Sequence, residues 1–265
     1  QRQMCIRDRV ITASGWDEAG RCTGIYKDGD VNKDLLKQPP EGEEKAWGWG
    51  TGSEAVAVEG DTIFIANTGN ELVCFRWNPR NIHEWAFLRK IGIGGDEKDT
   101  SIAMAARNGL LCLIRKSGEV QIRRASDLSL IRTFKVVNAK DVVIARDNSL
   151  WFIVENRIER YNLDGKKLPG TIADAGKPVA IAIGNDKGQL IVCDDGLRQQ
   201  VLFYDIANPQ QPKLVRTFGE KGGLRSGIPG EVKPLKFFAL RGAGTDAHGN
   251  VYVAMGLTLR EHIIR

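Results

Sequence analysis

Two tryptophans and a nearby carboxylate form one group of residues that could bind a ligand. Trp47 and Trp49 lie a few residues before Glu54, which immediately precedes the apolar run Ala55–Val58. Indole rings can stack on a sugar or on a peptide side chain. The alternative is that both rings cover the outer rim of the fold. Trp47, Trp49 and Glu54 are therefore candidate ligand-binding residues.

A second group consists of oxygen-bearing residues that follow expected strands, namely Asp17, Asn67, Asp194 and Asp195. If these strand ends meet around one rim, their oxygens could bind a cation or a polar ligand. Asn and Asp also accept hydrogen bonds from their own backbone in turns, and we favour this turn interpretation. Asn67 and Asp194 are kept as candidate ligand-binding residues.

Metal and thiol chemistry have weak support. Zinc needs three or four convergent donors, whereas His248 is expected in a turn and His262 lies in the C-terminal tail; the third histidine is His83. The five cysteines form no C-x-x-C pair. Cys74, Cys112 and Cys193 lie inside apolar runs and are expected to be buried and unpaired. We therefore predict no resident metal and no catalytic residue.

Composition narrows the class of protein. The chain has 265 residues, 42% hydrophobic and 27% charged, with a formal net charge of +5. No stretch approaches the ~18 apolar residues that a membrane-spanning helix needs. Basic residues alternate with acidic ones, so we expect no nucleic-acid surface. The sequence predicts neither a membrane span nor a nucleic-acid partner.

The elements that would position these residues recur along the chain. Apolar strands, interpreted as the inner strands of repeated units, begin near Val10, Ile63, Leu110, Leu150, Leu190 and Val251 at intervals of about 40 to 60 residues. Four short strands with their turns need about 40 residues, the usual length of a propeller blade. The sequence therefore predicts an all-β fold, a β-propeller with six blades, with insertions in the longer intervals.

Each unit opens with small residues, as in Ala55–Val58 and Ala180–Ile183. Such residues suit strands that crowd toward a central axis. Turn residues that tolerate positive φ follow, for example Asn108-Gly109 and Asp147-Asn148. The next strand is bulkier and suits packing between blades.

The two ends of the sequence do not follow this pattern. Residues 1–9 are highly charged and match no structural template, and we interpret them as a non-native leader. Residues 10–265 are expected to form a single propeller domain, a fragment that could be incomplete at one or both ends.

The segment Ile65-Ala66-Asn67-Thr68-Gly69-Asn70 resembles the repeat of NHL β-propellers, and Val192–Gly196 with Gln200–Phe203 is similar to a lesser degree. The wider relatives are the six-bladed SMP-30/gluconolactonase-like proteins. The resemblance implies a propeller that binds partners, and in that wider group some members are lactonases with one Ca²⁺ or another divalent cation at the axis.

The lactonase metal site is only partly matched. Glu54 corresponds to the family's Glu ligand. Pro178-Val179 stands where the resemblance implies an Asn, and Arg241-Gly242-Ala243 stands where it implies an Asp. An arginine at the axis would repel a cation. Arg241 is therefore a candidate ligand-binding residue, and Glu54 would be a metal ligand only in the lactonase alternative.

The leading functional hypothesis is a non-catalytic NHL-like scaffold that binds a protein or a carbohydrate. The residues around Trp47–Ser53 and Gly219–Pro234 are its expected binding loops. We expect a monomer, with a periplasmic or extracellular location as the favoured compartment. The alternative is a metal-dependent lactonase or related hydrolase of the SMP-30/gluconolactonase-like type.

Overall fold

Short β-branched and aromatic runs, separated by turn residues, make the described part of this chain mostly β-strand. Asn108 and Asn148 adopt φ values of 54° and 63° at tight turns, where Asn tolerates a left-handed backbone. Gly60 and Gly188 have φ values of 61° and 66° at the corresponding turns of two other sheets. These turns reverse the chain after each inner strand.

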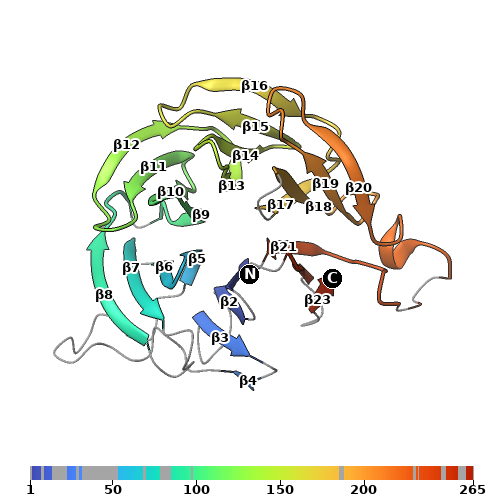
Figure 1. The fold of residues 1–265 in the computed structure, drawn as a ribbon, viewed down its shortest axis with the longest axis horizontal. Helices are drawn as coiled ribbons and strands as arrows, with labels where there is room; N and C mark the ends of the chain where they lie inside the picture. The colour runs from blue at the N-terminus through green and yellow to red at the C-terminus, as the bar shows by residue number, and fades with distance from the viewer. Residues whose placement is uncertain are drawn as a thin grey trace.

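The fold is seen in a computed structural model (Figure 1). The structure describes residues 2–6, 9–13, 23–27, 30–31, 53–67, 70–77, 85–96, 98–184, 188–228, 231, 233–245, 249–255 and 261–264. Within them the strands form six antiparallel sheets, and each sheet is a meander of strands that are consecutive in the chain.

The first three sheets are as follows. The first contains β1 (Arg2–Ile6), β2 (Arg9–Ala13), β3 (Thr23–Lys27) and β4 (Asp30–Val31). The second contains β5 (Ser53–Glu59), β6 (Thr62–Asn67), β7 (Glu71–Trp77) and β8 (Trp85–Gly92). The third contains β9 (Ser101–Arg107), β10 (Leu110–Arg115), β11 (Glu119–Arg124) and β12 (Leu130–Lys135).

The remaining sheets complete the series. The fourth contains β13 (Ala139–Ile144), β14 (Leu150–Val154), β15 (Arg157–Tyr161) and β16 (Lys167–Ile172). The fifth contains β17 (Pro178–Ile183), β18 (Gln189–Asp194), β19 (Gln200–Asp205) and β20 (Lys213–Phe218). A 3-10 helix, η1 (Gly223–Arg225), precedes the sixth, which contains β21 (Leu240–Thr245), β22 (Val251–Met255) and β23 (Glu261–Ile264).

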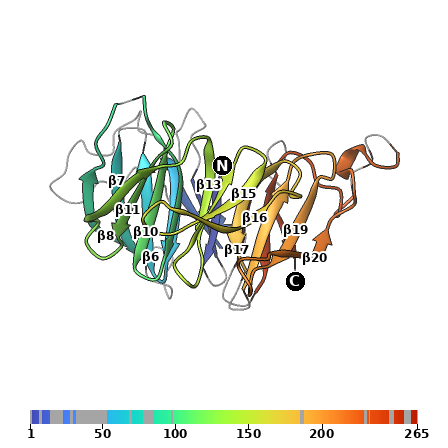
Figure 2. The same ribbon diagram turned by 90° about the horizontal axis from the view of Figure 1, so that it is seen from above.

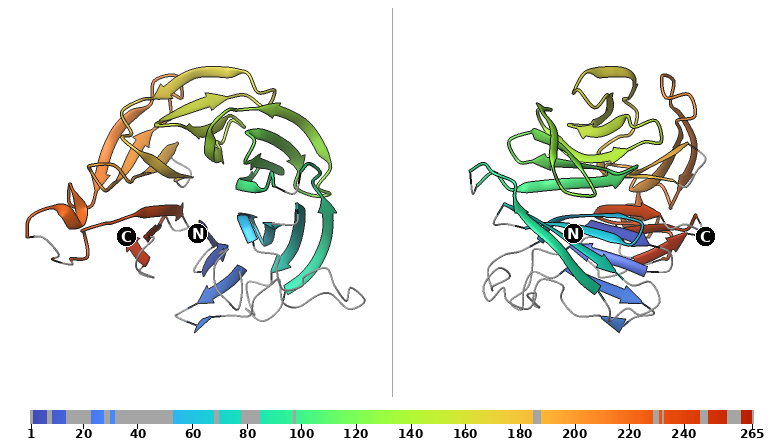
Figure 3. Two further views of the ribbon diagram at one scale, coloured as in Figure 1. Left: turned by 180° about the vertical axis from the view of Figure 1, so that it is seen from behind. Right: turned by 60° about the vertical axis from the view of Figure 1, so that its left-hand side comes forward.

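The sheets stand around a common axis as blades of a propeller (Figures 1 and 3). The inner strands β1, β5, β9, β13, β17 and β21 contact one another in that order, and β21 also contacts β1. The ring of inner strands is therefore closed, and the all-β, six-bladed prediction is confirmed.

The core lies between blades rather than inside one. On β14, Leu150 and Phe152 pack with the third blade, whereas Trp151 and Ile153 pack with the fifth. Successive side chains of a strand point to opposite faces, so a blade with neighbours on both sides needs an apolar residue at every position. This explains why the second strands read as continuous apolar runs.

One prediction about strand order is wrong. The sequence places the inner strands at Val10, Ile63, Leu110, Leu150, Leu190 and Val251, but all six positions lie in the second strands β2, β6, β10, β14, β18 and β22. The innermost strands are the small-residue runs, such as β5 and β17, because bulky side chains fit between blades but crowd the axis.

Residues 2–6 form β1, which pairs with β2 from Arg2 opposite Ala13 to Ile6 opposite Arg9. The interpretation of residues 1–9 as a non-native leader stays a prediction, because strand pairing does not report the origin of a segment. Among the described residues, no helix is long and apolar enough to cross a bilayer. The segment after β20, which includes η1, projects beyond the edge of the ring (Figures 2 and 3).

Candidate functional site

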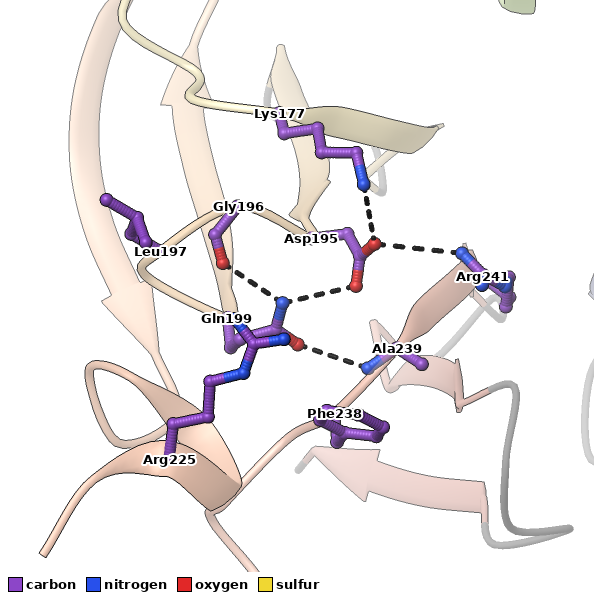
Figure 4. A pocket seen from close by; sticks show the side chains of 9 residues that line it. All are labelled: Lys177, Asp195, Gly196, Leu197, Gln199, Arg225, Phe238, Ala239 and Arg241. Atoms are coloured by element: carbon purple, nitrogen blue, oxygen red, sulfur yellow. Dashed lines mark hydrogen bonds and ion pairs between the residues drawn. The ribbon is translucent and has the colours of Figure 1, made fainter.

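A cavity of about 460 Å³ lies between the fifth and sixth blades, on the face where the inner strands begin (Figure 4). Its walls come from the residue before β17, the β18–β19 turn, η1 and the start of β21. The lining residues are Lys177, Asp195, Gly196, Leu197, Gln199, Arg225, Phe238, Ala239 and Arg241.

The buried carboxylate of Asp194 builds the turn beneath this cavity. Its Oδ1 accepts hydrogen bonds from the backbone N–H of Lys177 at 2.9 Å and of Gly196 at 2.8 Å. Its Oδ2 accepts one from Nε of Arg198 at 2.6 Å. Gly176 permits this approach, because its φ is +76° and a Cβ there would lie 2.5 Å from Asp194 Oδ2. Asp194 therefore fixes the turn rather than lining the cavity.

The next residue, Asp195, gathers cations at the cavity wall. Its Oδ2 lies 3.2 Å from Nζ of Lys177 and 3.7 Å from Nη1 of Arg241. The side chain of Asp195 is only 11% exposed, whereas those of Lys177 and Arg241 are 59% and 49% exposed. One sheltered carboxylate thus holds two solvent-accessible cations close together.

Gln199 links the two blades across the cavity. Its Nε2 donates to Oδ1 of Asp195 at 3.2 Å and to the carbonyl of Gly196 at 3.0 Å. Its Oε1 accepts the backbone N–H of Ala239 at 3.1 Å. Both Gln199 and Ala239 have positive φ, 50° and 49°, which is uncommon for residues with a side chain. The backbone at Gln199 and Ala239 is therefore locally strained, and the hydrogen bonds of the Gln199 side chain hold it in place.

Two further side chains shape the mouth. The guanidinium carbon of Arg225 lies 5.9 Å from the ring centroid of Phe238, within cation–π range. In the described part of the chain, no hydrogen bond or ion pair engages this guanidinium. Leu197, at the tip of the β18–β19 turn, is 90% exposed. The mouth therefore combines three cations, one carboxylate and an exposed apolar side chain.

The insertion between β20 and β21 is held by a buried lysine. Nζ of Lys236 donates to the carbonyl of Ser226 at 2.8 Å and to Oε2 of Glu231 at 3.0 Å. The side chain of Lys236 is only 1% exposed, and a buried ammonium is tolerated when it is paired in this way. Gly222 then donates its backbone N–H to the carbonyl of Arg198 at 2.7 Å, which ties the insertion to the β18–β19 turn.

In the third blade, the last residue of the second strand is an arginine, whereas in the fifth blade it is Asp194. Arg115, the last residue of β10, is 1% exposed, and its Nε lies 3.1 Å from Oδ2 of Asp99 in the preceding inter-blade loop. Burial alone would raise the pKa of Asp99, but hydrogen bonds from Ser117 and the Arg115 guanidinium outweigh it and lower that pKa. The end of the second strand therefore organises the loop that enters the same blade.

Most inner strands carry a β-bulge near their start. In five blades the strand register skips one residue near its start, and the skipped residues are Glu54, Ile102, Lys140, Val179 and Arg241. Ile102, Lys140, Val179 and Arg241 are each more exposed than both of their neighbours in the chain. A bulge re-aims one side chain, so these four side chains are turned toward solvent at the end of the ring where the inner strands begin.

Of the predicted site residues, Asn67, Asp194 and Arg241 have described side chains, and these lie in two separate regions of the ring. Arg241 lines the cavity and Asp194 supports it. Asn67 lies in another blade, 1% exposed, with its Oδ1 accepting the N–H of Glu71 at 3.0 Å, as the turn interpretation predicts. Trp47, Trp49 and the side chain of Glu54 lie outside the described residues.

Sequence reasoning missed Lys177, Gln199, Arg225 and Phe238. No local pattern marks them, because they come from four separate segments that meet only in the folded ring. Among the described residues, no group of three or more His, Cys, Asp or Glu side chains could hold a metal ion. The histidines fall outside the residues whose side chains are described.

No family model matches the sequence, and no curated protein matches it. Solved structures do match. A Bacteroides thetaiotaomicron protein of unknown function is 12% identical with a TM-score of 0.70, covering 98% of this chain and 67% of that one. A chain of a mitotic checkpoint complex is 10% identical, with a TM-score of 0.60 and coverage of 94% and 68%. U3-55K is 10% identical, with a TM-score of 0.58 and coverage of 96% and 88%. At these identities, the likeness is one of β-propeller fold alone.

Proposed function

We propose that this chain is a non-catalytic, NHL-like propeller that binds a protein partner through the face bearing the cavity. The single observation that carries the proposal is Leu197, which is 90% exposed on a turn anchored by the buried Asp194 carboxylate. Binding residues concentrate in loops and turns that a rigid frame positions, and Leu197 offers an apolar contact at such a turn.

The surroundings of Leu197 support the same face. The insertion tied to its turn adds Ile228 and Leu235, which are 69% and 44% exposed. Charged residues surround the cavity, and interfaces commonly combine an apolar contact with a polar rim. The strand–turn–strand segment at Ile63–Phe75, with its likeness to NHL repeats, supports the family assignment. A fold neighbour from a mitotic checkpoint complex belongs to an assembly of proteins.

The lactonase alternative gains no support from the site. Its implied ligands would meet at the bulged positions of the inner strands, where Val179 and Arg241 stand in two of them. Neither valine nor arginine offers an oxygen donor to a divalent cation. A binding scaffold needs no particular residue at positions 179 and 241, whereas the lactonase alternative requires that both of the family's ligands were replaced there.

The proposal is tested with a library of random peptides displayed on phage and selected on the immobilised full-length chain. Calorimetry then measures the affinity of a selected peptide for the wild type, for Leu197→Glu and for a matched control, Leu130→Glu. Leu130 is 52% exposed on β12, the outer strand of the third blade. We expect Leu197→Glu to weaken binding at least about tenfold, equivalent to about 1.4 kcal/mol, with Leu130→Glu unchanged. Equal affinity in all three proteins would show that this face is not the binding face.

A further inference from the structure

We infer that the cavity between the fifth and sixth blades is a carboxylate-binding subsite, which receives an acidic side chain from an extended peptide segment of the partner. This inference rests on the proposed protein-binding function and names the chemistry of the partner at that face. It is argued from charge balance, from the exposure of the cations and from the apolar contact beside them.

Charge balance is the first argument. Three cations line the cavity, Lys177, Arg225 and Arg241, against the single carboxylate of Asp195. Lys177 and Arg241 both approach the same oxygen of that carboxylate, at 3.2 and 3.7 Å. One carboxylate cannot neutralise three cations, so the cavity keeps an excess positive charge. Walls that are partly sheltered from water strengthen the attraction of such a site for an anion.

The state of Arg225 is the second argument. Its guanidinium extends from η1 toward the β18–β19 turn (Figure 4). The guanidinium carbon lies 5.9 Å from the ring centroid of Phe238. Among the described residues, Arg241 makes only long contacts, at 3.7 Å to Asp195 and 3.4 Å to the carbonyl of Leu240. Guanidinium groups have a planar set of donors that matches a carboxylate in a bidentate pair. Both arginines therefore retain donors for an incoming anion.

The neighbourhood selects a peptide as the source of that anion. Leu197 lies at the cavity mouth and is 90% exposed, so an apolar residue of the ligand can pack there while a nearby acidic residue enters the cavity. A volume of about 460 Å³ is within the usual range for ligand sites and exceeds what one carboxylate fills. The cavity therefore fits a short segment that combines acidic and apolar residues.

The probe for this subsite is a fluorescein-labelled peptide of alternating glutamate and leucine, compared with the same peptide carrying glutamine for glutamate. Fluorescence anisotropy measures both peptides against the full chain at two salt concentrations. We expect the glutamate peptide to bind more tightly than the glutamine peptide by at least about tenfold, with the difference shrinking at high salt. Equal binding of the two peptides would overturn the carboxylate subsite.

Arg225→Gln is the test variant, and Arg216→Gln is its matched control. Arg216 also stands over an aromatic ring, Phe203 at 4.0 Å, but it lies on the outer strand β20. Arg225→Gln should weaken the glutamate peptide about tenfold or more, and Arg216→Gln should leave it unchanged. Equal losses in both variants would show nonspecific attraction and contradict the subsite. Lys177→Gln, in a different segment, repeats the test independently of the fold of η1.

The outcomes separate this inference from the proposed function. If displayed peptides bind and Leu197→Glu abolishes their binding while Arg225→Gln does not, the face is correct and the carboxylate subsite is wrong. If the display selection yields peptides whose binding ignores Leu197, the proposed function itself is wrong. Loss of binding in Leu197→Glu, Arg225→Gln and Lys177→Gln, but not in Leu130→Glu or Arg216→Gln, supports both.

Discussion

The guanidinium of Arg241 lies 3.7 Å from the carboxylate of Asp195, so one ion pair joins the inner strand of the sixth blade to a turn of the fifth. Apolar layers also join these two blades, as in the cluster that packs β18 against β22. A polar connection at the same boundary leaves charged groups accessible on one face. The candidate site is therefore a property of the boundary between blades rather than of either blade.

The buried Asp194 carboxylate should be essential to this turn. Replacing it by alanine leaves the Lys177 and Gly196 amides and the Arg198 guanidinium without their acceptor. We expect Asp194→Ala to lower the free energy of unfolding by about 3 kcal/mol, measured by urea denaturation. Asp205→Ala is the control, because in the described part of the chain the Asp205 carboxylate accepts only the N–H of Ala207, in an exposed turn. A loss below about 1 kcal/mol for both variants would contradict the account of this turn.

The Arg115–Asp99 pair should give the third blade a pH-dependent stability. Because the fold lowers the pKa of Asp99 below its usual value of 3.8, its contribution is present above that value. The contribution is lost as the pH falls through the lower, folded-state pKa. Asp99→Asn should remove this part of the pH dependence and cost about 2 kcal/mol near neutral pH, because Arg115 is buried.

Asp164→Asn is the matched control for Asp99→Asn. Asp164 pairs with Arg132 at 3.1 Å, but both side chains are more than half exposed, so its loss should cost less than about 1 kcal/mol. Chemical denaturation between pH 2 and pH 7 measures both effects. Identical pH profiles for the wild type and Asp99→Asn would show that the ion pair does not contribute in this way.

The buried ammonium of Lys236 should determine the order of the insertion. Lys236→Met keeps the aliphatic length but removes the bonds to Ser226 and Glu231. We expect faster amide hydrogen exchange across residues 222–236, with the blades unaffected. Lys233→Met is the control, because Lys233 contacts the same carboxylate at 2.9 Å with its side chain 50% exposed. Equal exchange rates in the two variants would refute this role for Lys236.

The strand cysteines should be inert in the folded protein. Burial raises the pKa of Cys74 to about 11, and it raises the pKa values of Cys112 and Cys193 further above their usual range. Only the thiolate reacts with iodoacetamide, so these three thiols should resist alkylation at pH 8 until denaturant is added. Peptide mass spectrometry locates the modified residues. Rapid alkylation of Cys112 without denaturant would show that the apolar layer between blades opens readily.

The fold was largely predictable because its determinants are local. Alternating small and bulky strands, as in Ala55–Val58 followed by Ile63–Ala66, and turn residues such as Asn148 specify a blade within about 40 residues. The predicted starts of the inner strands were wrong at all six positions, because inner and second strands are both apolar. Burial of both faces of the second strands, seen at Trp151 and Phe152, resolves that ambiguity.

The site was less predictable because its determinants are distant in sequence. Lys177 and Arg241 meet only through the packing of two blades. The bulges that re-aim Arg241 and Lys140 depend on strand register, which no single strand encodes. Burial of Lys236, a residue type that is mostly exposed, depends on partners supplied by its own insertion. Asp194 was recognisable as a turn residue, and its contacts agree with that interpretation.

The central claim is that a protein partner binds the face formed by the β18–β19 turn and the insertion. Amide hydrogen exchange of the full chain, with and without a peptide selected by display, tests it most directly. We expect slower exchange at residues 194–199 and 222–239, with no change in the opposite-face turns at residues 107–110 and 145–149. Protection confined to those opposite-face turns would contradict it.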